Sequence, residues 1–361
     1  MRFSFLGRVA VILFLGSVSG GCAHLRMPHP PHWPAAWPWH KTPPADQDLR
    51  SKAAAGDAAA QYALGFSLLY GDGLPRNIDE GLTWLRKAGD SGYLKAQTAL
   101  GQLFLKGITD VPKNEPEAAG WLQKAAAQGS SSAQASLGAL CLTKGSPVYD
   151  PEAGVVWLKR AAEQGDVNAQ LALAMMYSKG AVVAQNDPEC ARWSRKAAEQ
   201  GHRDGQTRLG IAYYRGKGVA QSFDEARRWF ELAAAQDDAA AMSNLGVMVG
   251  RGEGFPAKDE AAAVAWFRKA AERGDADGQS NLGAAYYRGS GIAQDAAEAL
   301  KWFRAAAEQG HALAQFRLGF MYASGHGVPA DMNEAKKWIG KAAAQGNAQA
   351  LKWLQEHAAP K

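Results

Sequence analysis

The amino-acid sequence predicts an all-α solenoid of about eight helix-turn-helix repeats followed by a C-terminal capping helix. A leucine and a tryptophan each recur eight times, independently of one another, at spacings of 36 or 37 residues. The leucines are Leu64, Leu100, Leu137, Leu173, Leu209, Leu245, Leu282 and Leu318. The tryptophans are Trp84, Trp121, Trp157, Trp193, Trp229, Trp266, Trp302 and Trp338. Units of this length cannot bury an apolar face alone, so they must stack.

The clearest repeat occupies residues 279–310. Leu282 and Tyr286 share one helical face, glycines at 289 and 291 break the pattern, and a second helical pattern carries Trp302. Most of the leucines are followed by glycine. Glycine destabilises a helix by about 0.5–1 kcal/mol relative to alanine, so we expect another helix to approach closely there.

Residues 1–21 have the pattern of an export signal. Arg2 and Arg8 precede a short apolar run from Val9 to Val18, which is followed by small residues before Cys22. This run is too short to span a bilayer comfortably, so we expect cleavage. The segment resembles a bacterial lipobox, which implies that Cys22 becomes a lipid-modified N-terminus and that the chain is periplasmic and anchored to the outer membrane. Ordinary cleavage with release into the periplasm is the alternative.

Residues 22–50 change abruptly in composition and contain seven prolines, three tryptophans and four histidines. We expect an extended, semi-rigid tether before a solenoid domain at residues 51–361. Two other interpretations stay open: the tryptophans lie at a lipid headgroup layer, or the histidines collect a metal. The histidines lack a defined coordination pattern, so no metal site is predicted. They are His24, His29, His32 and His40.

Two places in the solenoid depart from the regular repeat. Asp237 stands where the other units end in glycine, and we expect a weak point there. After Gly346 a ninth first helix begins, with Leu354 in the position of the recurring leucine, and we expect it to cover the last apolar face.

The repeat resembles the Sel-one-like repeat (SLR), a relative of the tetratricopeptide repeat. The residues that carry the resemblance are Ala314, Gln315, Leu318, Gly319, Tyr322, Gly325, Gly327, Val328, Glu334, Ala335, Trp338, Lys341, Ala342, Ala343 and Gly346. The resemblance implies a right-handed α/α superhelix with a concave surface for partner proteins.

No motif in the sequence predicts catalysis. The Gly-x-Gly pairs recur in the turns between the two helices of a repeat, and no Gly-Lys-Ser/Thr follows them. We therefore expect no phosphate loop and no cofactor. A net charge of +5 is too small to indicate nucleic-acid binding. Cys141 and Cys190 occupy apolar or small-residue positions, and a disulfide between them stays open. Some exported proteins of the resembling family are cysteine-rich and linked to β-lactam hydrolysis or binding, but this chain lacks their cysteine framework.

The first helices of the later repeats carry the candidate partner-binding surface. We expect the positions two before, two after, and five and six after the recurring leucine to face a groove that is apolar with a row of basic groups. The candidate residues are Ile211, Tyr214, Arg215, Arg251, Tyr287, Arg288, Phe316 and Phe320. Such a surface suits an extended segment with apolar anchors and acidic groups. The alternative is structural: the arginines favour helix C-termini and the apolar residues pack on the next repeat.

The sequence therefore predicts a non-catalytic scaffold or adaptor in the cell envelope that binds a protein or peptide. A cell-wall enzyme, a peptidoglycan-binding or β-lactam-binding protein, and an exported effector are the alternatives.

Overall fold

The computed structural model describes residues 44–357, and the predicted signal, Cys22 and most of the tether lie outside them. The described residues form helices joined by short turns, with one isolated antiparallel bridge between Ile108 and Val111 and no strand. They divide into two compact units. Unit 1 runs to Met176 and includes Ala181–Val183; unit 2 comprises Tyr177–Gly180 and the chain from Ala184 onward. In the described part of the chain, no helix is both long and apolar enough to cross a membrane.

The helices alternate between the first and the second helix of each repeat, as predicted. Unit 1 holds α1 Pro44–Ala54, α2 Ala58–Tyr70, α3 Ile78–Asp90, α4 Leu94–Lys106, α5 Glu115–Ala127, α6 Ser131–Leu142, α7 Pro151–Glu163 and most of α8 Val167–Lys179. Unit 2 holds α9 Asp187–Glu199, α10 Arg203–Arg215, α11 Phe223–Ala234, α12 Ala239–Arg251, α13 Glu260–Glu272, α14 Ala276–Arg288, α15 Ala296–Glu308, α16 Ala312–Ser324, α17 Met332–Ala344 and α18 Ala348–Glu356.

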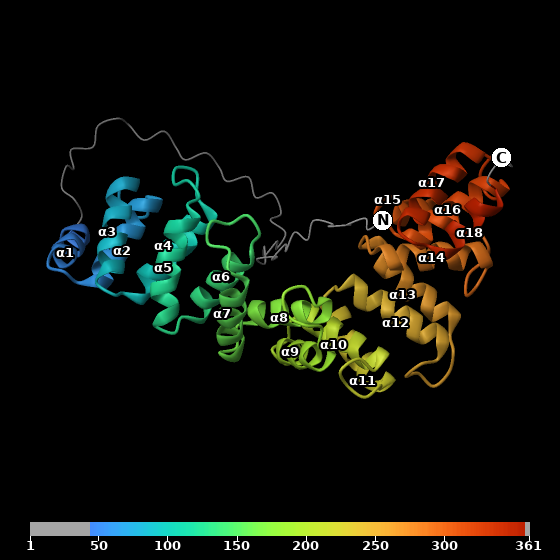
Figure 1. Ribbon diagram of the computed structural model, residues 1–361, viewed down its shortest axis with the longest axis horizontal. Coiled ribbons are helices and arrows are strands. Elements are labelled where there is room, and N and C mark those ends of the chain that lie inside the picture. Colours follow the sequence, from blue (N-terminus) through green and yellow to red (C-terminus); the bar gives the residue numbers. More distant parts are fainter. Residues whose placement is uncertain (1–43, 358–361) are drawn as a thin grey trace, which may run out of the picture. The chain divides into compact units, whose positions relative to one another are not determined.

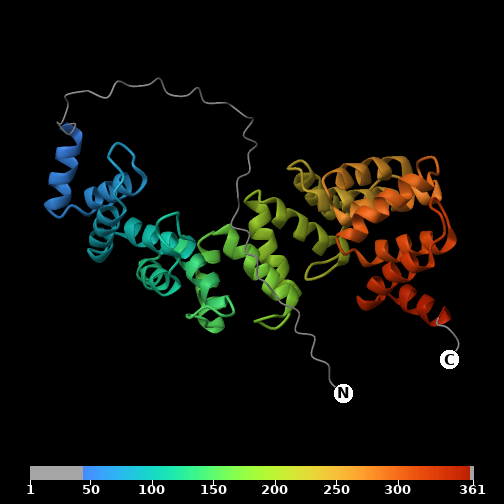
Figure 2. The same ribbon diagram turned by 90° about the horizontal axis from the view of Figure 1, so that it is seen from above.

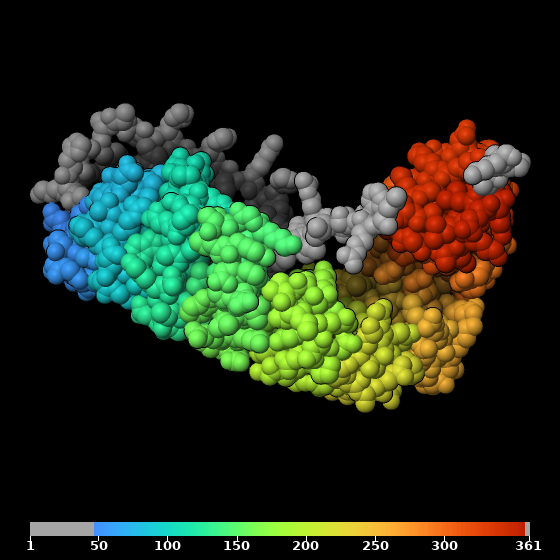
Figure 3. Space-filling view, in the orientation of Figure 1, coloured from blue at the N-terminus to red at the C-terminus, as the bar shows by residue number. Residues whose placement is uncertain are grey.

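Within each unit, a first helix packs against the second helix that follows it, and the pairs stack in chain order (Figures 1 and 2). On the surface the repeats of each unit form successive bands of colour (Figure 3). The even-numbered helices from α2 to α16 are the first helices, and the odd-numbered helices from α3 to α17 are the second. The predicted all-α solenoid of eight repeats with a C-terminal helix, α18, is confirmed.

Helix α1 was not expected from the sequence. It begins at Pro44, inside the segment that composition assigned to the tether. Proline is compatible with the first turn of a helix, where its missing N–H leaves no intrahelical bond unmade. The packed region therefore starts before residue 51.

The glycine after the recurring leucine does lie where a neighbouring helix approaches closely. A Cβ built on Gly283 would lie 2.8 Å from Cδ1 of Phe303, the residue that follows the tryptophan on α15. At Gly210 the same atom would lie 2.7 Å from Phe230 on α11. Each glycine therefore makes room for a large side chain from the second helix of its own repeat.

The leucine and the aromatic residue four positions on also contact the repeat before their own. Leu209 and Tyr213 share a cluster with Ala198 of the preceding α9 and with Trp229 of α11. Arg195 of α9 donates to the Tyr213 hydroxyl at 2.7 Å. The expected seam within one repeat is therefore also a seam between repeats.

The recurring glutamine links second helices of consecutive repeats. Gln315 Nε2 donates to the Ala307 carbonyl at the end of α15, at 3.0 Å. Its Oε1 accepts from Nε2 of Gln345, which follows α17, at 2.8 Å. Gln345 Nε2 also donates to the Gly310 carbonyl at 2.9 Å. We call this arrangement the glutamine bridge. It recurs around Gln97, Gln134 and Gln279.

Where the glutamine is absent, a different contact replaces it. Met242 occupies its position, and Arg273 stands at the position that Gln345 holds two repeats later. Asp237 adopts a left-handed φ of 62°, and Arg273 Nη2 contacts its carboxylate at 2.6 Å. The pair is exposed, so it contributes little stability. The expected weak point is thus a strained residue held by an ion pair.

The two described cysteines are free thiols. Cys141 is buried, as expected for a small apolar residue, and Cys190 is partly buried.

Candidate functional site

Pockets recur at one position of the repeat, between two consecutive first helices. The residue that follows the tryptophan on the intervening second helix lies at the floor. In unit 2, one such pocket lies between α14 and α16 over Phe303, and another between α12 and α14 over Phe267. In unit 1, one lies between α2 and α4 over Leu85. The surface formed by the first helices of unit 2 is therefore indented in two consecutive repeats, and unit 1 has one pocket of the same kind.

The pocket between α14 and α16, here called the α14–α16 pocket, brings four predicted residues together. It has a volume of about 220 Å³. Tyr287 and Arg288 come from α14, and Phe316 and Phe320 come from α16. The remaining lining residues, which the sequence did not single out, are Ala284, Phe303, Arg317 and Met321.

Four aromatic side chains line this pocket. Phe316 and Phe320 lie with ring centroids 6.3 Å apart, and Phe320 is 42% exposed. The Tyr287 ring lies 6.5 Å from the Phe303 ring and 5.1 Å, edge to face, from the ring of His326. Phe303 itself is buried. An exposed aromatic side chain at the edge of an apolar pocket is typical of protein-binding surfaces.

Two arginines line the same pocket without an acidic partner among the described residues. Arg317 is partly buried, donates weakly to the Ser280 carbonyl at 3.3 Å, and lies 5.5 Å from the centroid of the Phe303 ring. Burial, with the nearby charge of Arg288, lowers the pKa of Arg317. The pocket thus combines apolar walls with two positive charges.

The expected row of basic groups is therefore only partly present. Arg251 is not free: its Nη1 donates to the Tyr214 hydroxyl at 2.9 Å and lies 3.9 Å from the Glu253 carboxylate. The Tyr214 hydroxyl donates to Glu253 at 2.8 Å, and burial together with this carboxylate raises the pKa of Tyr214. Arg215 is exposed and has no ion pair within the described chain. The contacts of Arg251 and Tyr214 favour a structural role for these residues over a role in partner binding.

Other predicted groove positions are partly or fully buried. Ile211 packs against the core cluster around Phe230. The position two before the recurring leucine holds Thr207, Ser243 and Ser280, and all three are buried. For these three residues the expectation of a groove position is wrong; Ser280, for example, is contacted by Arg317 of the next first helix, α16. Phe316 stands at the same position before Leu318 and does line the α14–α16 pocket.

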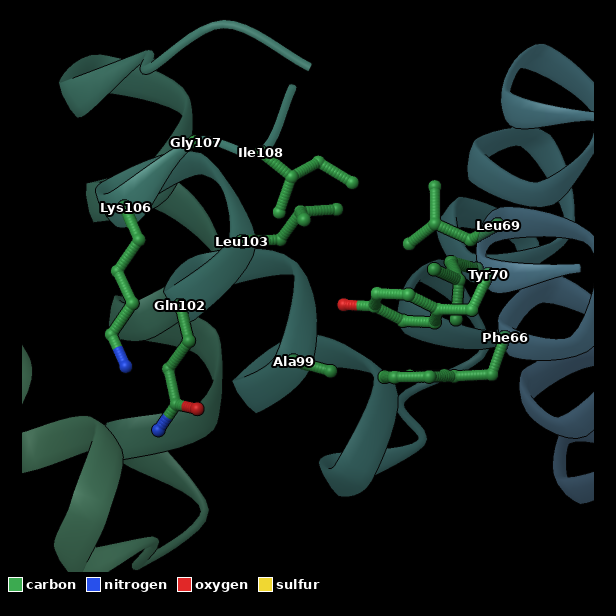
Figure 4. A pocket seen from close by; sticks show the side chains of 10 residues that line it. Phe66, Leu69, Tyr70, Ala99, Gln102, Leu103, Lys106, Gly107 and Ile108 are labelled. Carbon is green, nitrogen blue, oxygen red and sulfur yellow. The ribbon is translucent and has the colours of Figure 1, made fainter. Parts of the chain in front are cut away.

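Unit 1 has an equivalent pocket with different chemistry (Figure 4). Phe66 and Tyr70 project from α2 toward α4, with ring centroids 5.6 Å apart, and Tyr70 is 56% exposed. Leu103 and Ile108 face them from the other side. We call this the α2–α4 pocket, and its volume is about 240 Å³. The sequence analysis did not single out these residues, although Phe66 and Tyr70 stand two and six positions after Leu64.

Comparisons with known proteins identify the family of this chain. The Sel1 repeat model matches residues 58–93, 94–130, 131–166, 167–202, 203–238, 239–275, 276–311 and 312–347. The chain belongs to the Sel1 repeat family. This confirms the resemblance that the sequence carried, and a Sel1 repeat solenoid suggests a protein–protein interaction scaffold.

Two solved Sel1 repeat structures are similar to this chain. A Sel1 repeat protein from Oxalobacter formigenes is 37% identical with a TM-score of 0.69, covering 86% of this chain and 90% of its own. A protective antigen with an SLR fold, present in uropathogenic Escherichia coli strains, is 31% identical with a TM-score of 0.70, covering 84% of this chain and 65% of its own. A comparison with curated proteins found no match.

The described residues contain no cluster of three or more histidine, cysteine or acidic side chains placed to hold a metal. The histidines of the predicted tether lie outside the described residues.

Proposed function

We propose that this Sel1 repeat protein is a non-catalytic scaffold that binds an extended protein segment along its first helices. The observation that carries the proposal is the repetition of apolar pockets between consecutive first helices, with exposed aromatic residues at their rims. An extended chain presents side chains at regular intervals, so regularly spaced pockets suit it. The unpaired arginines of the α14–α16 pocket add a preference for acidic groups.

Site-specific photo-crosslinking tests the proposed surface. A photo-reactive phenylalanine analogue replaces Phe320, which is 42% exposed on the first helix α16. The matched control replaces Leu232, which is 43% exposed on the second helix α11. We expect a discrete crosslinked partner from position 320 in intact cells and none from position 232. Equal crosslinking at both positions, or none at 320, would contradict the proposal.

We also propose that the protein is exported and anchored to the outer membrane through a lipid on Cys22, with its solenoid in the periplasm. The support is the apolar run and the small residues that precede this cysteine. Mass spectrometry of the mature N-terminus tests it. A diacylglyceryl-modified Cys22 is the expected species, and an N-terminus at any other residue would refute the lipid anchor.

Purified protein should turn over neither a chromogenic β-lactam nor peptidoglycan fragments. Hydrolysis above the rate of a sample in which the solenoid has been unfolded would overturn the non-catalytic assignment.

A further inference from the structure

We propose that the α14–α16 pocket binds the C-terminal residue of a partner chain, with its apolar side chain in the pocket and its α-carboxylate between Arg288 and Arg317. This inference rests on the proposed scaffold function and names the chemistry that one of its pockets recognises.

The apolar part of the pocket has room for one large side chain. Its volume of about 220 Å³ is below the roughly 300–1,000 Å³ of sites for drug-sized ligands. Phe303 forms the floor, and Phe316, Phe320 and Tyr287 line it. A single aromatic or branched aliphatic side chain would bury most of its surface there.

The charged part of the pocket contains two arginines and no acidic side chain. Several arginines elsewhere in the structure contact a carboxylate: Arg86 contacts Glu117 at 2.9 Å, and Arg273 contacts Asp237 at 2.6 Å. Others, such as Arg195, pair with a tyrosine hydroxyl instead. Arg288 and Arg317 have no acidic partner in the described part of the chain, although they lie close enough for one to disfavour the charge of the other. Like charges that share a partly buried site are unfavourable until an anion enters. A carboxylate fits, because the guanidinium fork binds it through two parallel hydrogen bonds.

The structural alternative accounts for only one of these two arginines. Arg288 is in the last turn of α14, where a cation is favoured by the helix dipole. Arg317 is in the middle of α16, where the dipole gives no such benefit. Its contacts there are with Ser280 and with the Phe303 ring, and neither of them carries a negative charge. A bound anion would supply that charge.

A chain terminus fits the pocket better than an acidic side chain does, because the positive groups and the apolar surface lie close together. The guanidinium groups and the aromatic rings line one small pocket. The ligand must therefore present a carboxylate and an apolar group close together. A C-terminal residue carries both on the same Cα, whereas an internal acidic residue separates its carboxylate from the neighbouring apolar side chain, which points to the other side of an extended strand.

The α2–α4 pocket serves as an internal comparison. Tyr70 and Ala99 stand there at the positions of Arg288 and Arg317. Lys106 is the one basic residue that lines this pocket, so the pocket offers aromatic surface without the pair of guanidinium groups. Of the two pockets, we expect only the α14–α16 pocket to select ligands with a carboxylate.

Fluorescence anisotropy with the full chain tests the inference. The probes are labelled peptides of eight residues that end in phenylalanine, leucine or valine with a free carboxylate. Each has an amidated counterpart and a third version in which the amidated apolar residue follows an aspartate. We expect at least one free-acid peptide to bind, with about tenfold or greater weakening on amidation. The aspartate version should bind like the plain amide.

Variants then locate the effect. Arg317→Gln should remove the difference between acid and amide, while Arg228→Gln, at an exposed arginine of α11, should keep it. Equal binding of acid and amide, equal binding of the aspartate version, or no binding of any free-acid peptide would overturn the inference. If crosslinking from position 320 persists in that case, the scaffold proposal stands; if it is also lost, both fail.

Discussion

The glutamine bridge gives the sharpest test of how the repeats are held together. Gln315 is 4% exposed and makes two hydrogen bonds, one to the Ala307 carbonyl and one from Gln345. We consider Gln315→Met, which keeps the side-chain volume and removes both bonds. Methionine is known to fit this position, because Met242 occupies it in another repeat.

The structure limits the size of the effect. The Ala307 carbonyl also accepts from the Gly310 N–H at 3.0 Å, so it does not become an unpaired buried group. The Gln345 amide is exposed and keeps its bond to the Gly310 carbonyl. Only the net value of two neutral hydrogen bonds is lost, about 0.5–1.5 kcal/mol each. We therefore expect Gln315→Met to lower the free energy of unfolding by about 2 kcal/mol, or Tm by roughly 4–8 °C for a unit of this size.

Thermal unfolding followed by far-UV circular dichroism measures the change, and Gln345→Ala with the double variant completes a cycle. Gln345→Ala alone should be milder, because its side chain is exposed. The double variant should be less destabilised than the sum of the singles, since both remove the same bond. A Gln315→Met variant as stable as wild type would refute the reasoning, because it would mean that burying the amide offsets its hydrogen bonds.

Three further predictions concern single sites. Gly283→Ala should destabilise by about 1–3 kcal/mol, because its Cβ meets Phe303, whereas Gly340→Ala on α17, with no atom within 4 Å, should stabilise by about 0.5–1 kcal/mol in the same melts. Burial raises the pKa of Asp275, the N-cap of α14, so its ionisation lowers stability as pH rises through that raised pKa. Asp275→Asn keeps the helix cap and should raise Tm at neutral pH. It should leave Tm unchanged in acid, where the side chain at position 275 is neutral in wild type and variant alike; an equal change in Tm at both pH values would contradict the prediction. Burial also raises the pKa of the Cys141 thiol, so it should react with a thiol reagent much more slowly in native than in denaturant-unfolded protein.

The candidate site was predictable only in part. Tyr287, Arg288, Phe316 and Phe320 were selected from their distance to the recurring leucine, and the structure brings them into one pocket. Arg317 was missed because it immediately precedes that leucine, a position the helical pattern did not assign to the groove. Arg251 was predicted as a free charge, and it has partners that the pattern could not reveal.

By itself, the sequence determined the two-helix unit, its number of copies and the need for glycine beside the leucine. These features depend on helical periodicity and turn chemistry, which act over a few residues and repeat along the chain. Only the tertiary structure decided which side chains meet across repeats. Gln315 bonds to Gln345 and Tyr214 bonds to Glu253, whereas Arg317 contacts no carboxylate within residues 44–357. Such partners come from different helices, and their pairing depends on the exact packing of one repeat on the next, which no local pattern encodes.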